Sequence, residues 1–236
     1  FLRVPQITSN SSTPNRLVVI GFKGHARVVS EAAQAAGFDV IGLLVEKHIE
    51  KDAPSWPVFR GLSEIDLDYV GLALGIGLNF LRENVYARIA AEFPHAVFPA
   101  IVHPTAFVSP SAKIGAGSVL LPHSSVGFES EVGVGALLNT GSSLDHNSTL
   151  SAFASLGPGA RTGGDVAVGE RSVIGLNSGV LQGRHVGTDT VVGAHSLVFN
   201  DLGNLVVAYG TPAKKIRSRL KSDPYLDKTS FRAHSG

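Results

Sequence analysis

From Val102 onward, apolar residues recur at every sixth position of the chain. Each of these positions up to Val198 carries Val, Ile or Leu, except Thr162, which is β-branched. The residue two places earlier is small, being Ala, Ser or Thr, with breaks at Val166 and Arg184. Neither a helix nor an ordinary strand has a period of six, whereas a triangular prism of stacked hexapeptides has that period. The pattern predicts a left-handed parallel β-helix with 18-residue coils, a little over five of them without insertion.

Within this prism, the type of each side chain indicates whether it points inward or lies at a corner. The aliphatic residue is expected to point inward and the small residue to fit a tight corner. Glycine often follows the aliphatic position directly, and we expect it to provide turn dihedrals that side chains resist. These glycines are Gly115, Gly127, Gly133, Gly157, Gly163, Gly169, Gly175, Gly187 and Gly193.

The chain before the prism has the alternating apolar runs of a small α/β domain. Residues 17–20 form a continuous apolar run typical of a buried parallel strand, and a turn leads into a predicted helix over 26–36. A second strand is predicted at 38–44, which completes a βαβ unit of Rossmann-like type. Further strands are expected at 58–59, 69–74 and 96–98, with a helix over 80–91.

These patterns divide the chain into four segments. Residues 1–16 are a polar lead-in, 17–100 the α/β domain, 101–201 the β-helix, and 202–236 a C-terminal cap and tail. We expect the α/β domain to cap one end of the prism and the segment 202–219 the other, with the last residues loose.

Composition removes several function classes. A net charge of +1 argues against a nucleic-acid binder. No apolar run approaches the roughly 18 residues that span a bilayer, and the first five residues lack a signal-peptide pattern. The absence of cysteine excludes a thiol nucleophile and favours a cytoplasmic protein. The histidines show no metal-ligand spacing, so we expect no metal.

Several short motifs resemble those of bacterial sugar acyltransferases related to sialic acid O-acetyltransferase and to N-acetyltransferases of nucleotide-linked 4-amino sugars. The motifs are Ile20–Ala26, Gly75–Asn79, His103–Ala106, Asn139–His146 and Tyr209–Lys214, and the resemblance spans about residues 17–216. It implies a homotrimer with active sites between neighbouring prisms. It also implies a nucleotide sugar held by the N-terminal domain and acetyl-CoA lying along the prism wall.

The resemblance places the catalytic base at His146. Acyl transfer needs a group that removes a proton from the attacking nucleophile, and histidine titrates near the working pH. Two residues depart from the family pattern. Asn147 stands where an acidic residue usually orients the imidazole, with Asp145 as a possible substitute, and Ser155 stands where a histidine is often found near the substrate.

The same resemblance assigns most of the ligand-binding residues, and the 18-residue coil adds one of them independently. Gly164 lies one coil above His146, about 4.8 Å away, where its missing side chain would admit the thioester and its N–H polarise the carbonyl. Together with Gly164, the expected acetyl-CoA channel comprises Gly175, Leu176, Asn177, Ala194, Pro212 and Lys214. The expected nucleotide-sugar residues are Gly21, Phe22, Lys23, Gly24, His25, Glu46, Gly77, Asn79, Asn139 and Ser155. A helix N-terminus after Gly21 suits a phosphate, but the spacing is not that of a dinucleotide fingerprint.

Three functions remain open at this point. The leading one is an acetyl-CoA-dependent N-acetyltransferase acting on a nucleotide-linked amino sugar in glycan or surface polysaccharide synthesis. The second is an O-acetyltransferase acting on sialic acid or a related sugar, which would depend more on a strong base. The third is a trimeric binding module that has lost catalysis.

Overall fold

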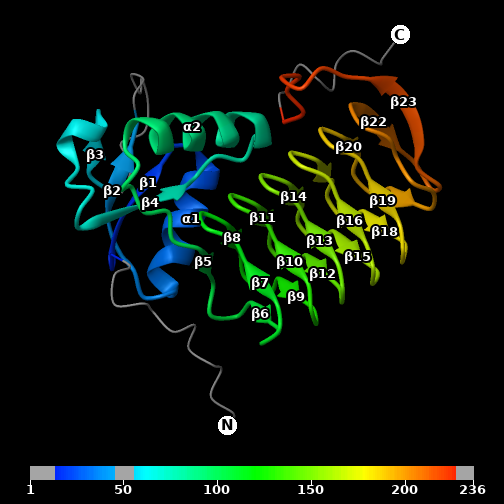
Figure 1. Cartoon of the computed structure of the whole chain (residues 1–236), viewed down its shortest axis with the longest axis horizontal. Helices are drawn as coiled ribbons and strands as arrows, with labels where there is room; N and C mark the ends of the chain where they lie inside the picture. The colour runs from blue at the N-terminus through cyan, green and yellow to red at the C-terminus, as the bar shows by residue number, and fades with distance from the viewer. Residues whose placement is uncertain (1–13, 46–55, 227–236) are drawn as a thin grey trace.

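A computed structural model describes residues 14–45 and 56–226. Its N-terminal domain is a four-stranded parallel sheet in the order β3-β2-β1-β4, flanked by two helices (Figure 1). The apolar runs form the central strands because both faces of the sheet are covered. The elements are β1 (Arg16–Ile20), α1 (Gly24–Ala35), β2 (Asp39–Leu44), β3 (Val58–Phe59), the 3-10 turn η1 (Leu62–Glu64), β4 (Val70–Leu74) and α2 (Asn79–Glu92).

The predicted strand at 96–98 is wrong. This segment is extended and makes one sheet-like hydrogen bond, from Leu72 N to Val97 O at 2.9 Å, but it forms no strand. It lies between Pro94 and Pro99, and proline has no N–H to donate to a ladder. The segment therefore only borders β4 before the chain enters the prism.

The β-helix has three parallel walls built from two-residue strands, as predicted (Figure 1). The first wall contains β5 (Ile101–Val102), β8 (Val119–Leu120), β11 (Leu137–Leu138), β14 (Ser155–Leu156), β17 (Val173–Ile174) and β20 (Val191–Val192). The second contains β6 (Phe107–Val108), β9 (Ser125–Val126), β12 (Ser143–Leu144), β15 (Arg161–Thr162), β18 (Gly179–Val180) and β21 (Leu197–Val198). The third contains β7 (Lys113–Ile114), β10 (Glu131–Val132), β13 (Thr149–Leu150), β16 (Ala167–Val168) and β19 (His185–Val186).

Every pairing between these strands joins residues one 18-residue coil apart. Ser125 pairs with Ser143, for example, and Glu131 with Thr149. The aliphatic positions from Leu120 to Val198 form one buried core, and Thr162 also points inward with 7% of its surface exposed. The coils are therefore continuous, without insertion, and their interior is apolar.

The small corner residues are buried and link successive coils. Ser130 Oγ donates to Asp145 O at 2.6 Å and accepts from Ser148 N at 3.0 Å. Burying a hydroxyl is tolerated when its hydrogen bonds are satisfied inside the protein. Serine therefore serves the corner better than a larger residue, which the close packing would exclude.

The expected reason for the repeated glycines is wrong. None of the glycines that follow the aliphatic position has a positive φ; instead, their backbones touch the next coil. A Cβ built on Gly175 would lie 2.6 Å from Val192 O. Left-handed backbone instead occurs two residues after each of these glycines. It recurs at every sixth residue from 117 to 195, including Asn147 and Asn177. Close stacking, not turn geometry, selects these glycines.

After the prism the chain adds two longer strands. β22 (Val206–Tyr209) runs parallel to β20, and β23 (Lys214–Ser218) returns antiparallel to β22. These strands lie at the end of the prism opposite the N-terminal domain (Figure 1). The chain then continues to Leu226, back toward α2.

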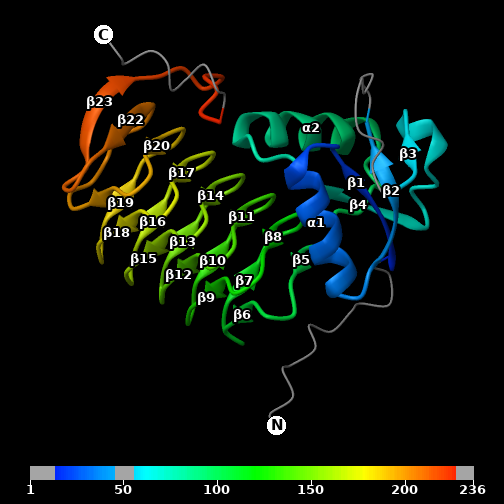
Figure 2. The same cartoon turned by 180° about the vertical axis from the view of Figure 1, so that it is seen from behind.

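The N-terminal domain shares an apolar core with the first wall. Val29 of α1 belongs to the same buried cluster as Val119 of β8 and Leu137 of β11. Figure 2 shows α1 beside β5 and β8, with α2 above the first-wall strands. Within the described residues, no helix has the length and apolar character needed to cross a membrane.

Arg82 of α2 joins the two domains through a fully buried guanidinium. Its Nε donates to Gly135 O at 2.7 Å and its Nη2 to Phe153 O at 2.9 Å, both in the prism. Its Nη1 donates to Ile76 O at 2.9 Å, in the loop before α2. Burial lowers the pKa of Arg82 to about 10, so the side chain still carries its charge at neutral pH.

Candidate active site

His146 lies at the edge between the second and third walls, in the turn from β12 to β13. Its Nδ1 is 3.0 Å from Asn147 Oδ1. Asn147 has φ +54°, a left-handed conformation that asparagine tolerates better than most residues. The amide of Asn147 donates from Nδ2 to Glu129 Oε2 at 3.2 Å, so Oδ1 is the atom that faces the ring. Nδ1 therefore carries the proton, and Nε2 is left free to accept one.

Asp145 does not replace the missing acidic partner of the imidazole. Its Oδ1 accepts a hydrogen bond from the backbone N–H of His146 at 2.8 Å. Its own backbone N–H donates to Thr162 Oγ1 at 3.0 Å. Asp145 therefore stabilises the turn, and Asn147 alone contacts the ring nitrogen among these two neighbours.

Gly164, on the coil above, lies directly against the imidazole. A Cβ built on Gly164 would overlap the Cε1 and Nε2 atoms of His146. The sequence predicted that Gly164 lies next to the base, but it assigned the vacant space to the thioester. In the structure the imidazole itself fills that space. A role for the Gly164 N–H toward a carbonyl stays a prediction.

The Gly164→Ala variant should lose at least about tenfold in kcat, because the added methyl group must push the imidazole from its position. Steady-state rates and the thermal midpoint of unfolding check this. Gly203→Ala is the matched control, since a Cβ there meets nothing within 4 Å and its φ is not positive. Equal rates for wild type and Gly164→Ala would contradict the assignment of His146 as the base.

A second group of predicted residues lies at the carboxyl ends of β1 and β4. Gly21 has φ +125°, and a Cβ built there would lie 2.8 Å from Gly75 O, so the two glycine-rich loops meet directly. Neighbouring strands β1 and β4 lead to opposite sides of the sheet, and such switch points bind ligands in open α/β folds. α1 begins at Gly24, with its N-terminus at this point, while Lys23 is exposed and Phe22 packs against the core.

His25 lies in the first turn of α1 and is uncharged. Burial and the positive charge of Arg82 lower the pKa of His25 to about 4. At neutral pH it therefore offers a hydrogen bond to a ligand and no charge for a phosphate. Glu46, which was expected at the nucleobase end, lies outside the described residues.

A cleft of about 640 Å³ brings many of the predicted residues together. It runs along the first wall and its edge with the second wall, from the N-terminal domain to β22 and β23. The predicted residues that line it are His25, Gly77, Asn139, Ser155, Gly175, Leu176 and Ala194. Its size and largely apolar lining suit a small-molecule ligand. Pro212 is exposed just before β23, Lys214 is exposed as the first residue of β23, and Asn177 is exposed at the prism edge. None of the three lines the cleft.

The predicted base and the cleft occupy different edges of the same prism. His146 and Gly164 follow second-wall strands, whereas Asn139 and Gly175 follow first-wall strands. His146 is not among the residues that line the cleft. Of the predicted acetyl-CoA residues, Gly164 lies beside His146, but one chain by itself does not bring His146 to the cleft.

Asn79 and Ser155 hold the two domains together. Asn79 is 1% exposed, and its Nδ2 donates to Arg171 O and Ser172 O at 3.0 Å each. Ser155 Oγ donates to Asn79 Oδ1 at 2.6 Å and accepts from Arg82 at 3.0 Å. These polar groups are satisfied inside the protein, so they stabilise the contact between the domains. Ser155 also lines the cleft, and substrate contact by either residue stays a prediction.

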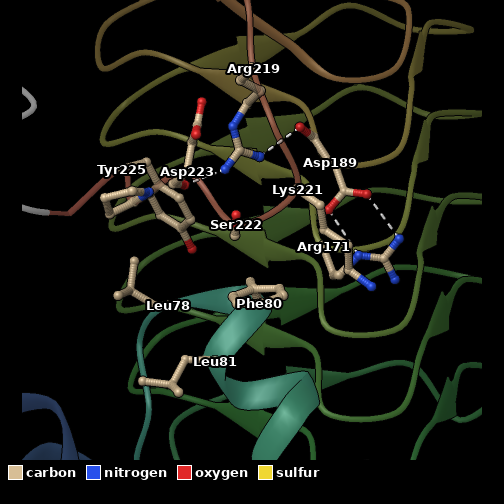
Figure 3. A pocket seen from close by; sticks show the side chains of 11 residues that line it. Leu78, Phe80, Leu81, Arg171, Asp189, Arg219, Lys221, Ser222, Asp223 and Tyr225 are labelled. Atoms are coloured by element: carbon tan, nitrogen blue, oxygen red, sulfur yellow. Dashed lines mark hydrogen bonds and ion pairs between the residues drawn. The ribbon is translucent and has the colours of Figure 1, made fainter.

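Residues 219–226 of the tail, whose last residues were expected to be loose, are held in place by several contacts (Figure 3). The remainder of the tail, 227–236, lies outside the described residues. The Tyr225 hydroxyl donates to Gly77 O and accepts from Asn79 N, both at 3.2 Å. Arg219 donates to Asp189 O at 2.7 Å, and Lys221 pairs with Glu83 of α2 at 2.9 Å. The C-terminal segment therefore packs against the loop that leads into α2.

Arg171 anchors this tail contact from the prism side. Its Nε and Nη2 each lie 2.9 Å from the Asp189 carboxylate, a bidentate pair, and Nη1 is 2.7 Å from Glu83 Oε1. The carboxylates around it raise the pKa of Arg171 above its usual value, chiefly through Asp189. Sequence reasoning missed this pair, although Arg171 and Asp189 lie one coil apart, a spacing that could have revealed it.

No group of three or more His, Asp or Glu side chains among the described residues is arranged to hold a metal ion. The arrangement instead offers a histidine with an oriented ring, and a separate cleft near the loop before α2. Together with the stacked coils, these features point to the class of hexapeptide-repeat acyltransferases.

Comparison with known proteins identifies the family. Residues 16–89 match the model of the PglD N-terminal domain. The acetyltransferase domain of PglB from Neisseria gonorrhoeae, solved with acetyl coenzyme A, is 31% identical with a TM-score of 0.81; the match covers 86% of this chain and 100% of that one. A mutant of GDP-perosamine N-acetyltransferase from Caulobacter crescentus, solved with CoA and GDP-perosamine, is 32% identical with a TM-score of 0.77, covering 86% and 97%. The chain belongs to this family of hexapeptide-repeat sugar acyltransferases.

Proposed function

We propose that this protein transfers the acetyl group of acetyl-CoA to the amino group of a nucleotide-linked amino sugar. The observation that carries the proposal is the His146 imidazole, oriented by Asn147 with Nε2 free. Its fold relatives from Neisseria and Caulobacter are acetyltransferases, one solved with acetyl coenzyme A and the other with CoA and GDP-perosamine.

In this proposal His146 Nε2 takes a proton from the amine as the amine nitrogen attacks the thioester carbonyl. The C–N bond forms, the C–S bond breaks, and the CoA thiolate leaves and is protonated. An amine is already a good nucleophile when it is neutral. A base oriented by an uncharged amide is therefore better suited to an amine than to a hydroxyl.

The separation of His146 from the cleft supports assembly as a homotrimer. Packing three prisms side by side would set the His146 edge of one chain against the Gly175 edge of the next. The cleft would then receive acetyl-CoA, with the loops at Gly21 and Gly77 holding the nucleotide. A cytoplasmic location and a role in glycan or polysaccharide synthesis complete the proposal.

A thiol-release assay tests the reaction directly. Acetyl-CoA is offered with UDP-, GDP- and dTDP-4-amino sugars, with the same nucleotide sugars bearing a 4-hydroxyl group, and with free sialic acids. We expect CoA release with one amino sugar and none with its hydroxyl counterpart. Release with sialic acid alone would show O-acetylation, and binding of a nucleotide sugar without any release would show a non-catalytic module.

A further inference from the structure

Glu129 lies one coil below Asn147, at the same edge as His146. Both residues have left-handed backbone, with φ +50° and +54°, so their side chains leave the edge from equivalent positions. Hydrogen bonds from the backbone N–H groups fix both residues. Glu129 N donates to Ser111 Oγ at 2.9 Å, and Asn147 N donates to Phe128 O at 2.8 Å. The contact between the two side chains therefore follows from the coil register.

The Asn147 amide forms a bridge between a carboxylate and the imidazole. Its Nδ2 donates to Glu129 Oε2 at 3.2 Å, while its Oδ1 lies 3.0 Å from His146 Nδ1. An amide can rotate to exchange its oxygen and nitrogen. A carboxylate accepts hydrogen bonds and cannot donate them, so Glu129 selects the orientation with Nδ2 toward itself and Oδ1 toward the ring.

The other carboxylates near the imidazole do not contact the ring in this way. Asp145, on the same coil, accepts from the His146 backbone. Asp165, on the coil above, donates its backbone N–H to His146 O at 2.9 Å. Glu129 is thus the carboxylate that reaches the imidazole through a chain of side-chain hydrogen bonds.

We propose that Glu129 is a positioning residue for His146 and acts through Asn147. It holds the amide so that Nδ1 keeps its proton and Nε2 faces the nucleophile. Its negative charge also polarises the amide and stabilises the imidazolium that forms during transfer. This inference rests on the proposed function, in which His146 is the base. It explains how the site works with an asparagine next to the histidine.

The Glu129→Gln variant should lower kcat about tenfold, because glutamine can present its own NH₂ and let the Asn147 amide turn over. The KM for acetyl-CoA should change less than about twofold. Loss of the nearby negative charge should also move the acid limb of the pH–rate profile to lower pH, by about half a unit. The matched control is Glu131→Gln, a neighbouring exposed glutamate paired with Lys113, which should leave the rate and the pH profile unchanged.

The Asn147→Asp variant places a carboxylate directly next to the His146 ring. It therefore tests whether Glu129 acts on His146 through Asn147. In that background, Glu129→Gln should change kcat less than about twofold. If Glu129→Gln still lowered kcat about tenfold in the Asn147→Asp background, the proposal would be overturned. An unchanged kcat and pH profile for Glu129→Gln alone would also overturn it. If His146→Ala retains full activity, the general-base assignment itself fails. If His146→Ala is inactive while Glu129→Gln behaves as wild type, only the role of Glu129 is lost.

Discussion

Replacing His146 with alanine should lower kcat at least about a hundredfold, which is the usual effect of losing a general base. Nε2 is the only nitrogen of this ring that can accept the proton, since Nδ1 faces Asn147 Oδ1. The imidazole lies half-buried at a prism edge and contributes nothing to the apolar core. The KM values and thermal midpoint should therefore remain close to wild type. Thiol release under saturating substrate measures the change.

His185→Ala is the matched control for this experiment. His185 is an exposed residue of β19 on the third wall, away from the His146 turn. Its removal should leave turnover within about twofold of wild type. A similar loss in both variants would point to a general effect on the prism, and no loss in His146→Ala would exclude this histidine as the base.

Replacing Arg82 with methionine should destabilise the protein by about 3–5 kcal/mol. The carbonyls of Ile76, Gly135 and Phe153 would lose a buried donor, at about 1–3 kcal/mol each. Removing the buried charge of Arg82 offsets part of this loss of stability. Desolvation of the guanidinium lowers the pKa of Arg82 to about 10, a shift that corresponds to about 3 kcal/mol. The unpaired carbonyls outweigh that gain.

The loss should appear as a fall of about 10 °C in the thermal midpoint, measured by calorimetry. Arg27→Met, at an exposed position of α1, is the control and should shift the midpoint by less than about 2 °C. Because Arg82 also binds Gly77 O at 3.2 Å, the KM for the nucleotide sugar should rise in the Arg82 variant. A midpoint equal to wild type would show that the two domains do not depend on this contact.

Periodicity made the β-helix and part of its site predictable. A constant 18-residue coil determines which residues stack, so the neighbourhood of His146 and Gly164 followed from counting. The same counting relates Glu129 to Asn147 and Arg171 to Asp189. The two glycine-rich loops were also predictable, because Gly21 and Gly75 directly follow apolar strands whose carboxyl ends meet.

Only the tertiary structure decided how the α/β domain, the prism and the tail fit together. Asn79 contacts Tyr225 across 146 positions, and Arg82 reaches Gly135 across 53, with no repeat relating either pair. The burial of Arg82, the inward role of Asn79 and Ser155, and the fixed tail all depend on this docking. The repeated glycines were visible in the sequence, but their cause was the contact with the next coil.

The sequence by itself therefore determined the fold class, the coil register and the place of His146 in the prism. The tertiary structure decided which polar residues line the cleft and which link the two domains, and it separated His146 from the cleft. The physical reason is that hydrophobic periodicity is local and repeats along the chain. Contacts between domains are instead set by the shapes and hydrogen-bonding groups of surfaces far apart in sequence.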